Sequence, residues 1–144
     1  QRVSVDLYQH LRVVYSYKMS TKIKDVMSHP VISIGGDIQL SHAKKMMYEN
    51  GIKHLPVLDR GSLIGLLSDR DVKLCYAVDG AKADTLKVAD ACSPEVFAVE
   101  QEESLSFVCK RMAEEGLGSA VIVEGDRAVG IFTVTDACRL LACR

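Results

Sequence analysis

Two hydroxyl residues, each followed three positions later by a carboxylate, are the strongest candidates for chemistry in this chain. Ser68 precedes Asp71 and Thr133 precedes Asp136, each within the pattern G-x-x-[ST]-x-x-D. A carboxylate one turn into a helix can accept two hydrogen bonds from a ribose cis-diol, and the amino end of a helix attracts phosphate. Each pair could therefore hold a nucleotide.

The same spacing also has a purely structural interpretation. A Ser or Thr at the N-cap with an acidic residue three positions later forms a capping box, which satisfies free backbone amides at the start of a helix. Asp71 and Asp136 would then stabilise their helices without binding a ligand. In that case Asp136→Ala would leave nucleotide affinity unchanged.

Basic residues accompany only the first of the two patterns. Lys53 and His54 precede the apolar residues 55–57, and Arg70 lies within the pattern itself. The equivalent positions of the second half are the neutral residues Gly118, Ser119 and Thr135. Scattered surface cations are common, so these residues alone do not indicate a site, but the first copy is basic where the second is neutral.

Composition and the remaining motifs argue against several other functions. The 144 residues carry 18 Lys+Arg against 19 Asp+Glu, without a basic run, so no nucleic-acid partner is expected. No apolar stretch is long enough to span a bilayer and no export signal opens the chain, which predicts a cytoplasmic protein without a membrane partner. The five cysteines show no metal-ligand spacing. No glycine-rich phosphate loop, nucleophile elbow or Cys/His dyad is present, so we expect neither an enzyme nor catalytic residues.

An internal repeat with a constant offset of 65 residues positions the two patterns. Residues 25–74 match residues 90–139 without a gap, and eleven of these fifty positions are identical. Each copy is predicted to form strand, helix, strand, strand, helix, which gives an α/β (α+β) fold. The expected elements are 31–34, 40–50, 54–58, 63–67 and 68–77 in the first copy, and 96–99, 105–114, 120–123, 128–132 and 133–142 in the second.

The repeat also suggests the domain organisation. We expect an amphipathic helix and lead-in over 1–22, a first repeat over 23–77, a polar connector over 78–89 and a second repeat over 90–144. The connector is too short to separate independent domains, so the repeats should pack together. The first residue, Gln1, leaves open that the sequence is a fragment of a longer protein.

These features resemble a tandem pair of CBS domains, the Bateman module. The resemblance rests on the repeat, on the sequence KHLPV at residues 53–57 followed by Asp59, and on LIGLLSDRDV at residues 63–72. It implies two repeats related by a pseudo-twofold axis, with two clefts between them. Such clefts bind AMP, ADP or ATP and sometimes S-adenosylmethionine, and no further cofactor is required.

The resemblance also implies roles for individual residues. Asp71 and Asp136 would each hold a ribose, and Ser68 and Thr133 would reach the ribose or phosphate, with Thr135 and Arg70 nearby. Adenine would lie against the first strand of the same copy: Val31 and Ile32 in the Asp71 cleft, Val96 and Phe97 in the Asp136 cleft. Lys53 and His54 would face the phosphates of the Asp136 nucleotide, so that cleft should bind phosphate more tightly.

The function that the resemblance implies is sensing. A homodimer would bind an adenine nucleotide and signal to an unidentified protein target through a change in the orientation of its repeats or subunits. Two alternatives stay open. One is a structural dimerisation or interaction module with vacant clefts, and the other is a regulatory fragment of a larger enzyme or transporter.

Overall fold

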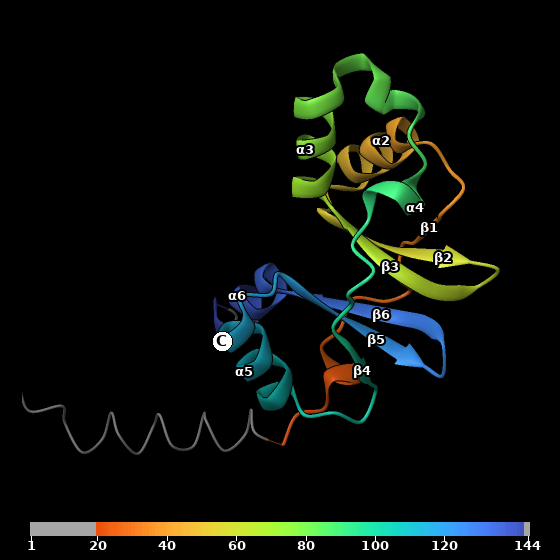
Figure 1. Cartoon of the computed structure of the whole chain (residues 1–144). Coiled ribbons are helices and arrows are strands. Elements are labelled where there is room, and N and C mark those ends of the chain that lie inside the picture. Colours follow the sequence, from red (N-terminus) through yellow and green to blue (C-terminus); the bar gives the residue numbers. More distant parts are fainter. Residues whose placement is uncertain (1–19, 143–144) are drawn as a thin grey trace, which may run out of the picture.

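The computed structural model describes residues 20–142 and contains two copies of one α+β unit (Figure 1). The first copy comprises β1 (Ile34–Gly35), α2 (Leu40–Asn50), β2 (His54–Asp59), β3 (Ser62–Ser68) and α3 (Asp69–Asp79). The second comprises β4 (Ala98–Glu100), α5 (Leu105–Glu115), β5 (Ser119–Glu124), β6 (Arg127–Thr133) and α6 (Val134–Ala142). The predicted fold class and element order are confirmed. The helix expected at the amino terminus lies outside the described residues.

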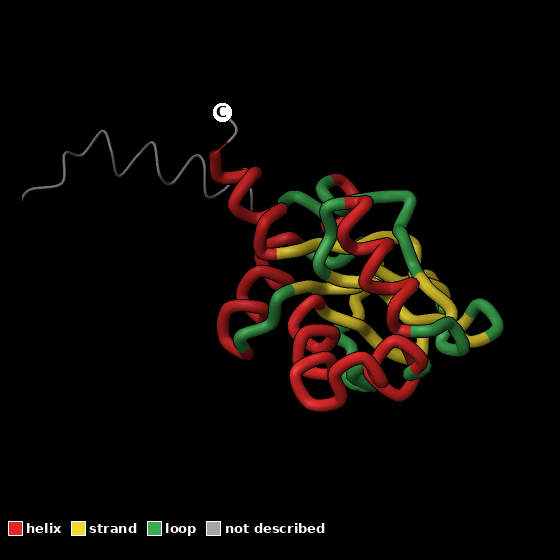
Figure 2. The backbone as a smooth tube through the Cα atoms, turned by 90° about the horizontal axis from the view of Figure 1, so that it is seen from above, coloured by secondary structure: helices red, strands yellow, loops and turns green. Residues whose placement is uncertain are grey.

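Each copy contains one three-stranded sheet with the same topology. The strand orders are β1-β2-β3 and β4-β5-β6, in which the first pair is parallel and the second pair is an antiparallel hairpin. Both hairpins shift register at equivalent places, after Val57 and after Ile122. The helices flank the two sheets, which occupy the middle of the molecule (Figure 2).

The ends of the first helix in each copy follow the local sequence. Gly51 ends α2 with a φ of 62°, and its N–H donates to the carbonyls of Met47 and Tyr48. Gly116 ends α5 in the same left-handed conformation, with a φ of 66°. Glycine adopts this conformation without steric cost, so the predicted helix ends are confirmed.

The connector between the copies, for which no secondary structure was predicted from the sequence, is helical. It contains a 3-10 helix, η2 (Gly80–Thr85), and a short helix, α4 (Val88–Ala91). The physical reason is burial, because Ala83 and Val88 are fully buried in the core of the first copy. Removing such apolar side chains from water favours a folded segment over a solvated loop.

The segments that precede the first strand of each copy, residues 20–33 and 80–97, are here called the lead-ins. They are exchanged, because each lead-in packs against the other copy. Ile23 of the first lead-in is fully buried in the core of the second copy, whereas Val88 of the second lead-in belongs to the core of the first. In Figure 1 the first lead-in, coloured red to orange, runs beside β4. Ser28 pairs with Ile131 of β6 through two backbone hydrogen bonds, of 2.8 and 3.1 Å. The exchange places residues after Ser28 beside the sheet of the other copy.

Two glycines make this exchange possible. A Cβ at Gly65 on β3 would lie 2.7 Å from the Cys92 sulfur and 2.8 Å from the Ser93 carbonyl oxygen. A Cβ at Gly130 on β6 would collide with the Met27 side chain. The lead-ins therefore pack directly on the backbone of strands from the other copy.

The exchange also explains why the first strands differ from the prediction. β1 and β4 begin at Ile34 and Ala98 instead of residues 31 and 96. In the first copy, the preceding residues leave the sheet to reach β6. The predicted strand 31–34 is therefore wrong for its first residues, which border a cavity between the copies.

Candidate functional site

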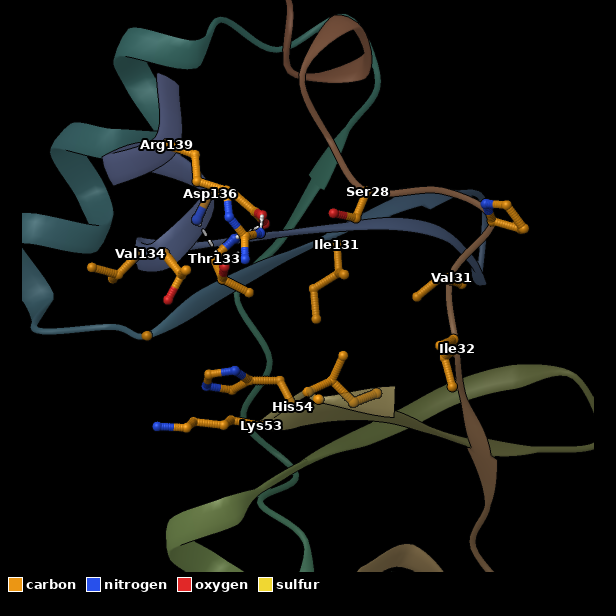
Figure 3. A pocket seen from close by; sticks show the side chains of 15 residues that line it. Ser28, Val31, Ile32, Lys53, His54, Ile131, Thr133, Val134, Asp136 and Arg139 are labelled. Atoms are coloured by element: carbon orange, nitrogen blue, oxygen red, sulfur yellow. Dashed lines mark hydrogen bonds and ion pairs between the residues drawn. The ribbon is translucent and has the colours of Figure 1, made fainter. Parts of the chain in front are cut away.

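A cavity of about 510 Å³ lies between the copies and is bordered by elements of both (Figure 3). This volume is within the usual range for sites that bind small molecules. The first copy and its lead-in contribute Ser28, Pro30, Val31, Ile32, Gly51, Ile52, Lys53 and His54. The second copy contributes Gly118, Ile131, Thr133, Val134, Thr135, Asp136 and Arg139. We call it the Asp136 cavity.

The Asp136 carboxylate is fixed at the start of α6 by Thr133. Its Oδ2 accepts hydrogen bonds from the Thr133 backbone N–H and hydroxyl, both 2.9 Å, and the Asp136 N–H donates to the Thr133 Oγ1 at 3.1 Å. Its Oδ1 lies 3.5 Å from Nη1 of Arg139. The carboxylate thus caps the helix through one oxygen while it borders the cavity. Capping and ligand binding do not exclude one another here.

Lys53 and His54 border the same cavity from the start of β2. Both side chains lie across the cavity from Asp136 and Thr133 in Figure 3. The imidazole packs against Gly118, where a Cβ would lie 3.0 Å from its Nε2. The structure therefore brings the predicted cations together with Asp136 and Thr133, as expected, and Thr135 lies with them.

Burial controls the charge of His54. It lowers the pKa of His54 below 6.5, and Lys53 acts in the same direction, while Asp71 and Asp69 oppose the shift. The neutral imidazole is therefore favoured at pH 7 in the ligand-free protein. An anion placed beside it would favour the protonated form.

The other side of the cavity is apolar. Val31 and Ile32 from the first lead-in lie there with Ile131 of β6 (Figure 3). Ile32 keeps 39% of its surface exposed, so part of this apolar wall is open to a ligand. The cavity thus has an apolar side and a cationic side, with a carboxylate and hydroxyls between them.

The Asp136 cavity combines the predicted walls and carboxylates differently from the prediction. Val31 and Ile32, which were predicted to lie in the Asp71 cleft, border the cavity of Asp136, because the first lead-in crosses to β6. Val96 and Phe97 do not border the Asp136 cavity. Phe97 packs against the core of the second copy, 5.3 Å from the Arg111 guanidinium.

The remaining predicted residues lie at the start of α3, outside the Asp136 cavity. The Ser68 N–H donates to Asp71 Oδ2 at 2.9 Å and the Asp71 N–H donates to Ser68 Oγ at 3.0 Å, which completes a capping box. Arg70 is exposed beside them. That these three residues bind a second nucleotide stays a prediction.

The sequence interpretation missed Arg139 and Ile131. Arg139 follows Asp136 by three residues on one helix, so helical spacing alone could have placed it on the same face. Ile131 needed the tertiary structure, because only the exchanged lead-in brings Val31 toward it.

Among residues 20–142, no group of three or more His, Cys, Asp or Glu side chains could hold a metal ion. Nor is any helix of that range long and apolar enough to cross a membrane.

Comparison with known proteins finds one domain family in both copies of the repeat. The family model for the CBS domain matches residues 23–77 and 88–143. A solved CBS domain pair, in complex with 5′-methylthioadenosine and S-adenosyl-L-methionine, is 27% identical with a TM-score of 0.76, over 85% of this chain and 96% of that chain.

Curated relatives differ in how much of their length the chain spans. The CBS domain-containing protein YhcV of Bacillus subtilis is 27% identical, over 81% of this chain and 82% of its own length. A homoserine O-acetyltransferase of Methanococcoides burtonii is 27% identical over 90% of this chain but only 26% of its own length. The chain thus spans about a quarter of the first relatives that it matches.

Proposed function

This chain belongs to the CBS domain family, and from that premise we propose that it is a regulatory module that binds an adenosine-containing ligand in the Asp136 cavity. The observation that carries the proposal is the Asp136 carboxylate, which Thr133 fixes in a cavity bordered by both copies. A carboxylate in this position can accept both hydroxyls of a ribose. The structural relative crystallised with two adenosine compounds supports this ligand class.

We propose further that the ligand is an adenine nucleotide: AMP, ADP or ATP. Its adenine would lie against Val31, Ile32 and Ile131, its ribose at Asp136 and Thr133, and its phosphates toward Lys53 and His54. The positive charge of Lys53 supports a phosphorylated ligand over S-adenosylmethionine, whose sulfonium is cationic. Thr135 lies at the start of α6, where helix amides favour an anion.

A second, weaker site at Asp71 remains part of the proposal. Ser68 and Asp71 are arranged like Thr133 and Asp136, but the positions equivalent to Lys53 and His54 are Gly118 and Ser119. A phosphate in that cleft would have Arg70 as its main cation. We therefore expect the Asp136 cavity to bind the phosphorylated ligand more tightly.

The proposed regulation is a population shift. A ligand held by residues of both copies stabilises one relative orientation of the copies, and the free energy available for signalling is its differential affinity for the two states. A homodimer would carry that change to a protein target. Exposed apolar side chains on α3 and α6 offer a surface for a second copy: Leu74, Val78, Val134 and Leu141.

Isothermal titration with AMP, ADP, ATP and S-adenosylmethionine tests the proposal. We expect saturable binding to the wild-type protein and at least tenfold weaker binding to Asp136→Asn, because a neutral amide replaces the acceptor of two ribose hydroxyls. Asp71→Asn is the matched control, since it alters the equivalent capping box, and it should retain most of the affinity. Circular dichroism confirms that both variants fold.

Two outcomes would contradict the proposal. If Asp136→Asn bound every ligand as the wild type does, the carboxylate would serve only as a helix cap. If the folded wild-type protein bound none of the four ligands, the alternative of a dimerisation or interaction module with vacant clefts would be favoured. Sedimentation analysis of the same sample would then test for the dimer.

A further inference from the structure

Arg139 is a charged residue of the Asp136 cavity that neither helix formation nor packing requires. It lies three residues after Asp136 on α6 and its side chain is 73% exposed. Its single contact with Asp136 Oδ1, at 3.5 Å, is at the limit of a hydrogen bond. An exposed ion pair of this length contributes little stability, so its partner can be exchanged at low cost.

The charges that border the cavity are not balanced. Among the described lining residues, Lys53 and Arg139 carry full positive charges and Asp136 is the carboxylate. A ribose bound to Asp136 through both hydroxyls would compete with Arg139 for Oδ1. The guanidinium would then face the ligand phosphates from the side of Asp136 and Thr133, opposite Lys53 and His54 (Figure 3).

A comparison of the two copies shows that the shared fold does not require an arginine at position 139. The equivalent position on α3 is Leu74, which is exposed, yet α3 begins with the same type of capping box as α6. An arginine at this position is therefore not needed to form the helix. One structural role remains, because a cation in the last turn of α6 interacts favourably with the helix dipole.

We propose that Arg139 is a specificity-determining residue that makes the cavity select phosphorylated adenosine ligands over unphosphorylated ones. In the ligand-free protein it pairs with Asp136. When a ribose hydroxyl binds Asp136 Oδ1, the Arg139 guanidinium leaves the carboxylate and binds a ligand phosphate instead. The planar guanidinium can donate two parallel hydrogen bonds to that phosphate. This inference rests on the proposed binding of an adenosine ligand beside Asp136.

The test compares ADP with adenosine, which differ only in the diphosphate. Arg139→Leu introduces the residue of the first copy, and Arg127→Leu, an exposed position at the start of β6 outside the cavity, removes the same charge as a control. We expect Arg139→Leu to weaken ADP binding about tenfold and to leave adenosine binding equal or tighter. Arg127→Leu should change neither affinity. Arg139→Lys should fall between wild type and Arg139→Leu, because it keeps the charge but loses the fork.

The outcomes separate this inference from the proposed function. If wild-type protein binds ADP and Arg139→Leu weakens ADP and adenosine equally, or weakens neither, then Arg139 does not select phosphate and the inference is overturned while the function stands. If the wild type binds neither compound, the inference about Arg139 and the proposed function are both contradicted. Thermal unfolding shows whether Arg139→Leu lowers the stability of the protein, and Arg139→Lys provides the same comparison with the helix-end charge retained.

Discussion

The ligand affinity of the Asp136 cavity should depend on pH through His54. Burial lowers the pKa of His54 in the ligand-free protein, although Asp71 and Asp69 on α3 partly oppose the shift and Lys53 reinforces it. A phosphate beside the imidazole stabilises its protonated form, so the pKa is higher in the complex than in the free protein. A group whose pKa rises on binding takes up a proton, and affinity therefore increases as pH falls.

The size of this effect can be estimated from elementary electrostatics. A unit negative charge about 5 Å from the imidazolium, at an effective dielectric constant between about 20 and 80, contributes roughly 1–3 kcal/mol. This corresponds to a pKa increase of about 1–2 units. Because one proton is involved, affinity cannot change by more than about tenfold per pH unit. As pH falls, the affinity begins to increase near the pKa of His54 in the complex. It stops increasing below the pKa of His54 in the free protein, which lies below 6.5.

Isothermal titration with ADP in buffers of different ionisation enthalpy measures the proton uptake directly. His54→Gln is the test variant, because glutamine keeps a polar side chain that does not titrate. The ligand's own phosphate takes up a proton near pH 6, so the quantity of interest is the difference between wild type and His54→Gln. Equal proton uptake by the two proteins, or a wild-type affinity that decreased with falling pH as steeply as that of His54→Gln, would refute the reasoning.

Three further predictions concern single residues. Lys53→Met should weaken ADP about fivefold in low salt and less in high salt, with Lys45→Met as control; a salt-independent loss would contradict an electrostatic role. Gly65→Ala should lower the free energy of unfolding in urea by about 1–3 kcal/mol, because its Cβ would lie 2.8 Å from the Ser93 carbonyl oxygen. Ser104→Ala removes the N-cap of α5 and should cost about 1 kcal/mol in the same assay. Unchanged unfolding midpoints would show that these contacts are looser than the structure indicates.

Local interactions explain what the sequence by itself determined. The helix ends at Gly51 and Gly116 depend on a left-handed conformation of one residue, and the Thr133–Asp136 capping contacts join positions three apart. Strand and helix order follow from apolar periodicity, which is also local. Because the two copies are offset by a constant 65 residues, an element predicted in one copy can be compared with the equivalent residues of the other.

The partner of each lead-in was decided only by the tertiary structure. Ile23 and Val88 are apolar in the sequence, but hydrophobic burial is not directional, and two similar cores are equally apolar to either segment. The bare backbone at Gly65 and Gly130 lets a lead-in pack on each strand, and in the tertiary structure each strand receives the lead-in of the other copy. That choice carries Val31 to the cavity of Asp136. Which side chains share a site is a non-local property, because it depends on contacts between segments about a hundred residues apart.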